Sequence, residues 1–167
     1  MKFLGQMGGA DVITRARSRV AKGTHYQLGA GGRDPSNDSP GAKCDCSGFV
    51  AWSLGIDRFL PNDGIPHLSG RDWFETTSIY DDARSPFGFV AEVPWTSARP
   101  GDVLVWPDRG RSQGHIGLVA SVDHTGPTSV VHCSTGNDRR TQDAVAETPA
   151  DIFRRNGALV GRVAWVS

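Results

Sequence analysis

The stretch that decides the fold comprises residues 43–52, KCDCSGFVAW, in which Cys44 and Cys46 are separated by a single aspartate. The chain contains one further cysteine, Cys133. Such a pair can be a disulfide, half of a metal site, two buried core residues, or a nucleophile beside a bystander. A Cys44–Cys46 disulfide would close a very small strained ring, and C-x-C is not the usual spacing of a zinc knuckle. The rest of the chain must decide between the other interpretations.

Residues 46–54, CSGFVAWSL, are predicted to form a helix that begins beside Asp45 and ends at Gly55. Asp45 suits the N-cap because its carboxylate can accept a hydrogen bond from an unpaired backbone N–H group of the first turn. Cys46 then lies in that turn, where the N–H groups and the helix dipole favour a thiolate. The same N–H groups can hold an oxyanion, and Gly48 leaves room for a substrate. The position therefore suits a nucleophile.

The composition excludes several classes of function. Lys and Arg number 18, and Asp and Glu also number 18, so nothing indicates binding to nucleic acid or to an anionic membrane. No apolar run reaches the length needed to span a bilayer. Residues 1–9 carry one Lys and only a very short apolar stretch, so we expect a loose leader and no signal peptide. Three cysteines are too few, and odd in number, for a disulfide framework.

The order of the predicted elements indicates an α+β fold in a single domain over residues 1–167. Helices are predicted at 10–23, 46–54 and 148–157, the last with Thr148 as N-cap and Pro149 in its first turn, and Trp73 and Phe74 are assigned to a short helix. Strands are predicted at 102–106, 114–123, 128–135 and 158–167, and a long polar loop at 28–43. Helices followed by consecutive strands are typical of N-terminal helices packed on a C-terminal antiparallel sheet.

Two histidines on neighbouring predicted strands are the candidates for a base that activates the thiol. Side chains alternate across a strand, so His115 and Gly117 share one face, whereas His132 and Cys133 point to opposite faces. A register that pairs residue 115 with 132, and 121 with 126 around a four-residue loop, would place the two rings side by side. Cys133 would then point away from the site. A nucleophile at a helix N-terminus, a base on one strand and an orienting group on the next is the general triad arrangement.

Several segments match, in order, the motifs of one known family. They are HYQLGAGG (25–32), which contains Tyr26, then DCSGFVAWSLGI (45–56), RPGDVLVW (99–106), GHIGLVASV (114–122) and SVVHCST (129–135). These segments resemble the upstream tyrosine, the nucleophile motif, the Gly-Asp strand, the His-bearing strand and the segment with the third catalytic residue of the NlpC/P60 family of cell-wall cysteine peptidases.

The resemblance implies a papain-like fold and a peptidoglycan hydrolase. Such an enzyme is a cysteine endopeptidase that cleaves amide bonds in cell-wall stem peptides, typically next to D-glutamate. Cys46 would be the nucleophile, His115 the general base and His132 the orienting residue, with Tyr26 as a substrate or oxyanion contact. Three neighbours of the nucleophile would complete the substrate site: Asp45, Ser47 and Gly48. Neither a metal nor another cofactor is expected.

Alternatives of different classes remain open. The related CHAP amidases share the Cys and His motifs, as do small amidase effectors injected by type VI secretion, so an N-acetylmuramoyl-L-alanine amidase on the same scaffold is the alternative enzyme. A non-enzymatic chain would be a binding module, or a domain stabilised by zinc held between the cysteines, His115 and His132. An N-terminus without a signal peptide suits a monomeric effector or phage enzyme that is made in the cytoplasm and delivered to the wall. Delivery machinery and an immunity protein are then expected partners besides the stem peptides.

Overall fold

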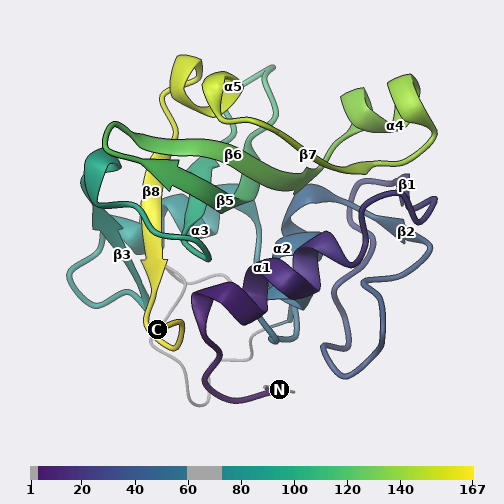
Figure 1. Ribbon diagram of the computed structural model, residues 1–167, viewed down its shortest axis with the longest axis horizontal. Coiled ribbons are helices and arrows are strands. Elements are labelled where there is room, and N and C mark those ends of the chain that lie inside the picture. Colours follow the sequence, from purple (N-terminus) through teal and green to yellow (C-terminus); the bar gives the residue numbers. More distant parts are fainter. Residues whose placement is uncertain (1–3, 60–72) are drawn as a thin grey trace.

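The computed structural model describes residues 4–59 and 73–167, and its centre is a six-stranded sheet (Figure 1). The strands follow the order β3-β8-β4-β5-β6-β7, and all neighbouring strands are antiparallel. Their bounds are β3 (Val90–Val93), β4 (Val103–Trp106), β5 (His115–Asp123), β6 (Gly126–Cys133), β7 (Val145–Pro149) and β8 (Leu159–Val163). The predicted α+β class with an antiparallel sheet is confirmed.

The core consists of two buried clusters, one on each face of the sheet. The larger cluster lies between the sheet and the helices α1 (Gly9–Arg17), α2 (Cys46–Ser53) and α3 (Thr76–Ala83), and includes Phe49 and Leu118. The smaller lies on the opposite face under α5 (Asp151–Arg155), where Phe153 packs with Val119. In Figure 1, α1 and α2 lie below the sheet and α5 above it. Because both faces are covered, the central strands carry near-continuous apolar runs instead of an alternating pattern.

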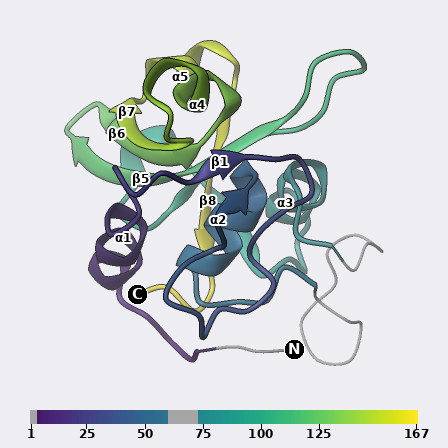
Figure 2. The ribbon, with the colours of Figure 1, turned by 90° about the vertical axis from the view of Figure 1, so that its right-hand side faces the viewer.

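A small parallel pair, β1 (His25–Tyr26) and β2 (Lys43–Cys44), lies beside the first three helices (Figure 2). Asp138 of α4 (Thr135–Thr141) holds β1 in place, because its carboxylate accepts a hydrogen bond from the Tyr26 N–H (2.9 Å) and lies 3.0 Å from His25 Nδ1. A short 3-10 helix, η1 (Trp95–Ser97), precedes β4. The segment between β1 and β2 is irregular, as predicted for the polar loop.

The helix of the CDCSG segment is confirmed in detail. α2 begins at Cys46, and the Asp45 carboxylate accepts a hydrogen bond from the Gly48 N–H at 2.8 Å. Gly55 ends the helical segment with φ +73°, a conformation that glycine adopts without strain. The first predicted helix is shorter than expected, since α1 ends at Arg17 and Ala21 takes a positive φ of 58°.

Other predicted elements are wrong, and the cause is tertiary pairing. Thr148 and Pro149 belong to β7, which pairs with β6, so α5 begins only at Asp151, with Ala150 as its N-cap. Trp73 and Phe74 precede a helix instead of forming one, because Glu75 caps α3 by accepting hydrogen bonds from the Thr77 and Ser78 N–H groups. Several elements were not predicted at all: β1, β2, α3, β3, η1, α4 and β7.

The described part of the N-terminal segment is bound to the rest of the chain and is not loose. The Leu4 N–H donates to the Gly55 carbonyl at 2.9 Å, and the Met7 N–H donates to the Trp165 carbonyl at 3.2 Å. The Ser167 N–H donates to the Met7 carbonyl at 3.1 Å. Within residues 4–59 and 73–167, no helix combines the length and the apolar character that crossing a membrane requires.

Asp102, the aspartate of the predicted Gly-Asp strand, forms a partly buried ion pair with Arg162 of β8. Its two carboxylate oxygens accept hydrogen bonds from Arg162 Nε at 3.0 Å and Nη2 at 2.8 Å, and one also accepts from the Arg99 N–H at 2.8 Å. The Asp102 side chain is 4% exposed and that of Arg162 27%. The pair therefore fastens the turn before β4 to the neighbouring strand β8.

We expect Asp102→Ala to lower the free energy of unfolding by about 2–3 kcal/mol, because the change leaves a half-buried guanidinium without its charged partner. Urea denaturation monitored by circular dichroism measures this loss. The matched control is Asp81→Ala on the exposed side of α3, which should stay within about 0.5 kcal/mol of the wild type. Equal losses in the two variants would show that the ion pair does not stabilise the fold.

Candidate active site

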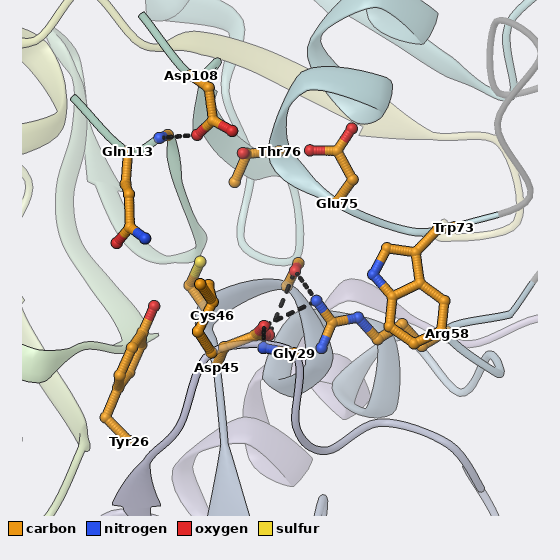
Figure 3. A pocket seen from close by; sticks show the side chains of 13 residues that line it. Tyr26, Gly29, Asp45, Cys46, Arg58, Trp73, Glu75, Thr76, Asp108 and Gln113 are labelled. Atoms are coloured by element: carbon orange, nitrogen blue, oxygen red, sulfur yellow. Dashed lines mark hydrogen bonds and ion pairs between the residues drawn. The ribbon is translucent and has the colours of Figure 1, made fainter. Parts of the chain in front are cut away.

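Cys46 lies at an open pocket of about 260 Å³ above the N-terminus of α2 (Figure 3). The pocket is lined by Tyr26, Leu28, Gly29, Asp45, Cys46, Ser47, Arg58, Trp73, Glu75, Thr76, Asp108, Gln113 and Gly114. Four of the predicted site residues are therefore in this lining: Tyr26, Asp45, Cys46 and Ser47. The two predicted histidines and Gly48 are not.

Gly48 has a different role from the predicted one. A Cβ at this position would lie 2.5 Å from the Ala30 carbonyl oxygen and 3.0 Å from Arg58 Nη1. The missing side chain therefore lets the loop at Ala30 and the guanidinium of Arg58 pack closely against the first turn of α2. It does not make room for a substrate, and this expectation is corrected.

The Asp45 carboxylate is buried and fully used in hydrogen bonds. One oxygen accepts from the Gly48 N–H at 2.8 Å and from Ser47 Oγ at 3.3 Å. The other accepts from the Gly29 N–H at 2.7 Å and from Arg58 Nη2 at 2.8 Å. The same carboxylate thus caps α2, fixes the loop that forms one pocket wall, and pairs with a buried cation.

The sulfur of Cys46 is surrounded by protein and is 5% exposed as a residue. Burial, with a smaller contribution from the Asp45 charge, raises the pKa of the Cys46 thiol to about 12. Hydrogen bonds from the backbone N–H groups of Ile116 and Ser47, together with the Arg58 charge, lower the pKa but do not outweigh burial. The first turn of α2 thus favours the thiolate as predicted, through the Ser47 N–H, but burial has the larger effect on the pKa. The thiol is protonated at neutral pH.

His115 and His132 are brought together as predicted, but through a different register. Leu118 pairs with Val131 and Val119 with Val130, which places His132 opposite Gly117 rather than opposite His115. The turn also differs, because residue 121 pairs with 129 and not with 126. A Cβ on Gly117 would lie 2.9 Å from His132 Cβ, so the glycine leaves the diagonal path between the rings open. Along this path His115 Nε2 lies 2.8 Å from His132 Nδ1.

The hydrogen-bonded chain continues from His132 to Thr148. His132 Nε2 lies 2.9 Å from Thr148 Oγ1 on β7. Sequence analysis assigned Thr148 to a helix cap and missed this contact, since the pairing of β6 with β7 is not visible in the local pattern. The three side chains share one face of three adjacent strands.

Both imidazole rings are neutral in this environment. Part of His115 reaches the surface, but its ring packs against Trp106, Phe153 and His132 with centroid distances of 5.2, 5.3 and 5.0 Å. Burial lowers the pKa of His115 to about 3, with a further contribution from His132, and lowers the pKa of His132 to about 4. A buried neutral imidazole can accept a proton as soon as a negative charge develops beside it.

The sulfur of Cys46 and the two imidazoles lie on opposite faces of the sheet. Cys46 belongs to the core cluster on the helix side, whereas His115 and His132 both contact Phe153 of the cluster on the other side. The hydrogen bonds of the described residues include none between Cys46 and either histidine. The Ile116 N–H lowers the pKa of Cys46, and Ile116 directly follows His115 in β5. The described contacts therefore bring the predicted nucleophile to the same strand as His115 but do not join the two side chains.

Tyr26 forms the wall of the pocket next to Cys46, with its hydroxyl group directed into the opening (Figure 3). Burial raises the pKa of Tyr26, and negative charge at Cys46 and Asp45 raises it further, so the phenol keeps its proton and can donate a hydrogen bond. Gln113 extends into the same opening from the opposite wall (Figure 3). Sequence analysis did not single out Gln113, although it stands two residues before His115.

Cys44 and Cys133 lie behind the nucleophile, away from the pocket. Both are buried with no exposed surface, and the Cys133 thiol donates to the Cys44 carbonyl at 3.3 Å. His132 and Cys133 point to opposite faces, as predicted. The zinc set considered from the sequence therefore does not converge. Residues 4–59 and 73–167 hold no group of three or more His, Cys, Asp or Glu side chains arranged for a metal ion.

The fold is similar to two solved structures. NlpC1 from Trichomonas vaginalis matches with a TM-score of 0.55 and 16% identity, over 99% of this chain and 48% of that one. NlpC2 from Trichomonas vaginalis matches with a TM-score of 0.52 and 17% identity, over 95% of this chain and 47% of that one. The chain thus spans about half the length of each protein, and at this identity the likeness concerns the fold. The predicted papain-like fold is confirmed.

Comparison with curated proteins gives no significant match. The family model of the CHAP domain, in contrast, matches residues 35–137, which include Cys46, His115 and His132. The sequence resemblance pointed to the NlpC/P60 family and to the related CHAP proteins, and this recognition is confirmed. Because the match covers more than half of its residues, the chain belongs to the CHAP domain family.

Proposed function

We propose that this protein is a peptidoglycan hydrolase in which Cys46 attacks amide bonds of cell-wall stem peptides. The observation that carries the proposal is a thiol in the first turn of α2 that faces an open pocket. The strand β5, which packs against α2, bears the first of two buried imidazoles in a hydrogen-bonded chain that ends at a hydroxyl group. Membership of the CHAP domain family supports the same reaction class.

The hydrogen-bonded chain allows two directions of proton donation, and the proposed chemistry uses one of them. In this direction Thr148 Oγ1 accepts from His132 Nε2–H, and His132 Nδ1 accepts from His115 Nε2–H. His115 Nδ1 is then left with a free lone pair. In this arrangement His115 is the general base, and His132 orients it and stabilises the imidazolium that forms.

The first half of the reaction forms an acyl-enzyme. The Cys46 thiol gives its proton to His115 Nδ1 while the sulfur bonds to the carbonyl carbon of the substrate. Backbone N–H groups of the first turn of α2 and the phenol of Tyr26 are the donors for the oxyanion. The C–N bond then breaks, and the amine leaves with the proton from His115. Because thiol and imidazole start neutral, the ion pair forms only in the presence of substrate.

The second half returns the enzyme to its starting state. A water molecule attacks the thioester and gives a proton to His115, and the sulfur leaves as the carboxylic acid product is released. Cys46 then recovers its proton from His115. No metal or cofactor takes part in these steps.

The finer proposal is an endopeptidase that cuts next to D-glutamate, and the alternative is an N-acetylmuramoyl-L-alanine amidase. The two activities leave different products from the same polymer. An endopeptidase leaves L-alanine attached to the muramic acid, whereas an amidase separates the glycan from the whole peptide. Mass spectrometry of muropeptides after digestion of purified peptidoglycan distinguishes them, and intact muropeptides would contradict the proposed reaction class.

We expect Cys46→Ala to lower peptidoglycan hydrolysis by at least about 1,000-fold without loss of the fold, because the covalent route is removed. The measurement is the release of soluble muropeptides, with circular dichroism for the fold. Cys44→Ser is the matched control, since a hydroxyl group can keep the hydrogen bond from Cys44 Sγ to the Asp45 carbonyl (3.3 Å). Activity that survives in Cys46→Ala and disappears in Cys44→Ser would assign the nucleophile to Cys44.

The same variants can be tested in cells by expressing the protein in a bacterial host with an appended periplasmic signal. Lysis by the wild type and by Cys44→Ser, but not by Cys46→Ala, is expected if the wall is the substrate. Lysis by all three proteins would indicate a toxic effect that does not depend on the thiol.

Substitutions along the chain from His115 to Thr148 are expected to lower kcat by progressively smaller factors. His115→Ala should lower kcat by about 1,000-fold or more, His132→Ala by about 10- to 100-fold, and Thr148→Val by about 10-fold or less, because each step lies further from the reacting atoms. Thr148→Ser is the control, since it keeps the hydroxyl group that contacts His132 Nε2. A His132→Ala enzyme as active as the wild type would remove His132 and Thr148 from the mechanism.

The neutral imidazoles predict that the protein loses stability in acid. The native pKa values of His115 and His132 are about 3 and about 4, below the ordinary value of 6.5. As the pH falls below 6.5, the unfolded chain binds protons that the native protein does not, so the free energy of unfolding decreases until the native pKa values are reached. Each group contributes at most about 1.4 kcal/mol per pH unit.

Denaturation midpoints at pH 7, 6, 5 and 4 measure this dependence. Asp82 acts in the opposite direction, because burial raises its pKa to about 6, so the test compares variants and not the wild-type curve alone. His132→Gln should show a shallower acid slope than the wild type, whereas His124→Gln on the exposed β5–β6 turn should not. Identical slopes in all three proteins would show that the buried imidazoles already carry their protons.

A further inference from the structure

Arg58 is a buried cation in the wall of the pocket, in a segment for which sequence analysis assigned no site residue. Its side chain is 3% exposed, and its guanidinium donates to four partners. Nη2 lies 2.8 Å from Asp45 Oδ2 and 2.8 Å from Ser47 Oγ, Nη1 lies 3.0 Å from the Ala30 carbonyl, and Nε lies 3.3 Å from the Phe74 carbonyl. The fork geometry of a guanidinium is suited to this set of acceptors.

Arg58 also contacts the aromatic rim of the pocket. Its guanidinium carbon lies 4.5 Å from the centre of the Trp73 ring, and Figure 3 shows the two side chains next to each other, to the right of Cys46. Arg58 therefore connects the N-terminus of α2 to the loop at residue 30 and to the segment before α3. Three walls of the pocket meet on one side chain.

The Asp45 carboxylate has an unfavourable effect as well as a useful one. It caps α2, but it also places a negative charge directly beside a sulfur that must become negative during the reaction. The backbone N–H groups of Ile116 and Ser47 also lower the pKa of Cys46, but they carry no net charge. The neighbouring side chains Tyr26 and Cys133 both have raised pKa values and stay neutral, and His115 is neutral in its buried site. Arg58 is the neighbouring cation, and its charge lowers the pKa of Cys46.

We propose that Arg58 is a positioning residue of this active site, which holds the Asp45 carboxylate as the cap of α2 and offsets its negative charge beside Cys46. The inference rests on the proposed function in so far as Cys46 is the nucleophile. It makes the two residues one functional unit: each alone is unfavourable, because an unpaired Asp45 opposes the thiolate and an unpaired Arg58 would be a buried free charge.

The test follows alkylation of Cys46 by iodoacetamide as a function of pH, with the labelled peptide identified by mass spectrometry. Arg58→Gln should move the alkylation profile to higher pH by about one unit, which is about tenfold slower labelling at a fixed pH below the transition. Asp45→Asn should move it to lower pH by a similar amount, while asparagine still caps the helix. The double variant should label close to the wild-type pH. If Arg58 had a purely structural role, combining the two substitutions would not bring the alkylation profile back to that of the wild type.

Arg162→Gln is the matched control, because it breaks an Arg–Asp pair away from the pocket. It should lower stability and leave the alkylation profile unchanged. If Arg58→Gln does not fold, Asp45→Asn and Arg58→Lys still test the proposal, since the first removes the negative charge and the second keeps the positive one near its place. Overlapping profiles for the wild type, Asp45→Asn and every folded Arg58 variant would overturn the inference.

Muropeptide release measured on the same proteins separates this inference from the proposed function. Shifted profiles without hydrolysis by the wild type would contradict the proposed function and support the role of Arg58. Hydrolysis by the wild type with unshifted profiles would support the function and reject the role of Arg58.

Discussion

The buried carboxylate of Asp45 is the interaction on which the candidate site depends. It accepts hydrogen bonds from the first turn of α2, from the loop at Gly29 and from Arg58. A buried charge is tolerated only when such partners are complete, because each missing partner leaves an unsatisfied charge in a poorly solvated place. The direction of α2, the position of Cys46 and two pocket walls are therefore determined together.

The positions of the His115 and His132 rings are determined by packing and not by charge. Trp106 and Phe153 pack against the rings, and Gly117 leaves space through which the rings contact each other across two adjacent strands. Neutral rings are compatible with this apolar enclosure, and charged rings are not. Cys46 is thus oriented by polar contacts on one side of the sheet, and the two imidazoles by apolar contacts on the other.

The sequence was sufficient for features that depend on local chemistry. The helix after Asp45, its end at Gly55 and the strands around His115 and His132 follow from capping, glycine conformation and apolar runs. It was insufficient wherever a distant segment decides the outcome. Thr148 looked like a helix cap but pairs with β6, and the β5–β6 register shifts at an irregularity near Ser121. Arg58 carried no local signal, because its partners lie between 11 and 28 residues away.

Most wall residues of the pocket come from connecting segments, whereas its floor belongs to the core of the fold. The floor is the first turn of α2, which is part of the main core, whereas residues such as Leu28, Trp73, Asp108 and Gln113 come from connecting segments outside the six-stranded sheet. Segments of this kind accept substitutions and changes in length with little effect on a folded core. Related chains can therefore keep the same chemistry while exchanging the loops that choose the peptide, and an engineer who grafts new loops here would alter substrate choice without rebuilding the scaffold.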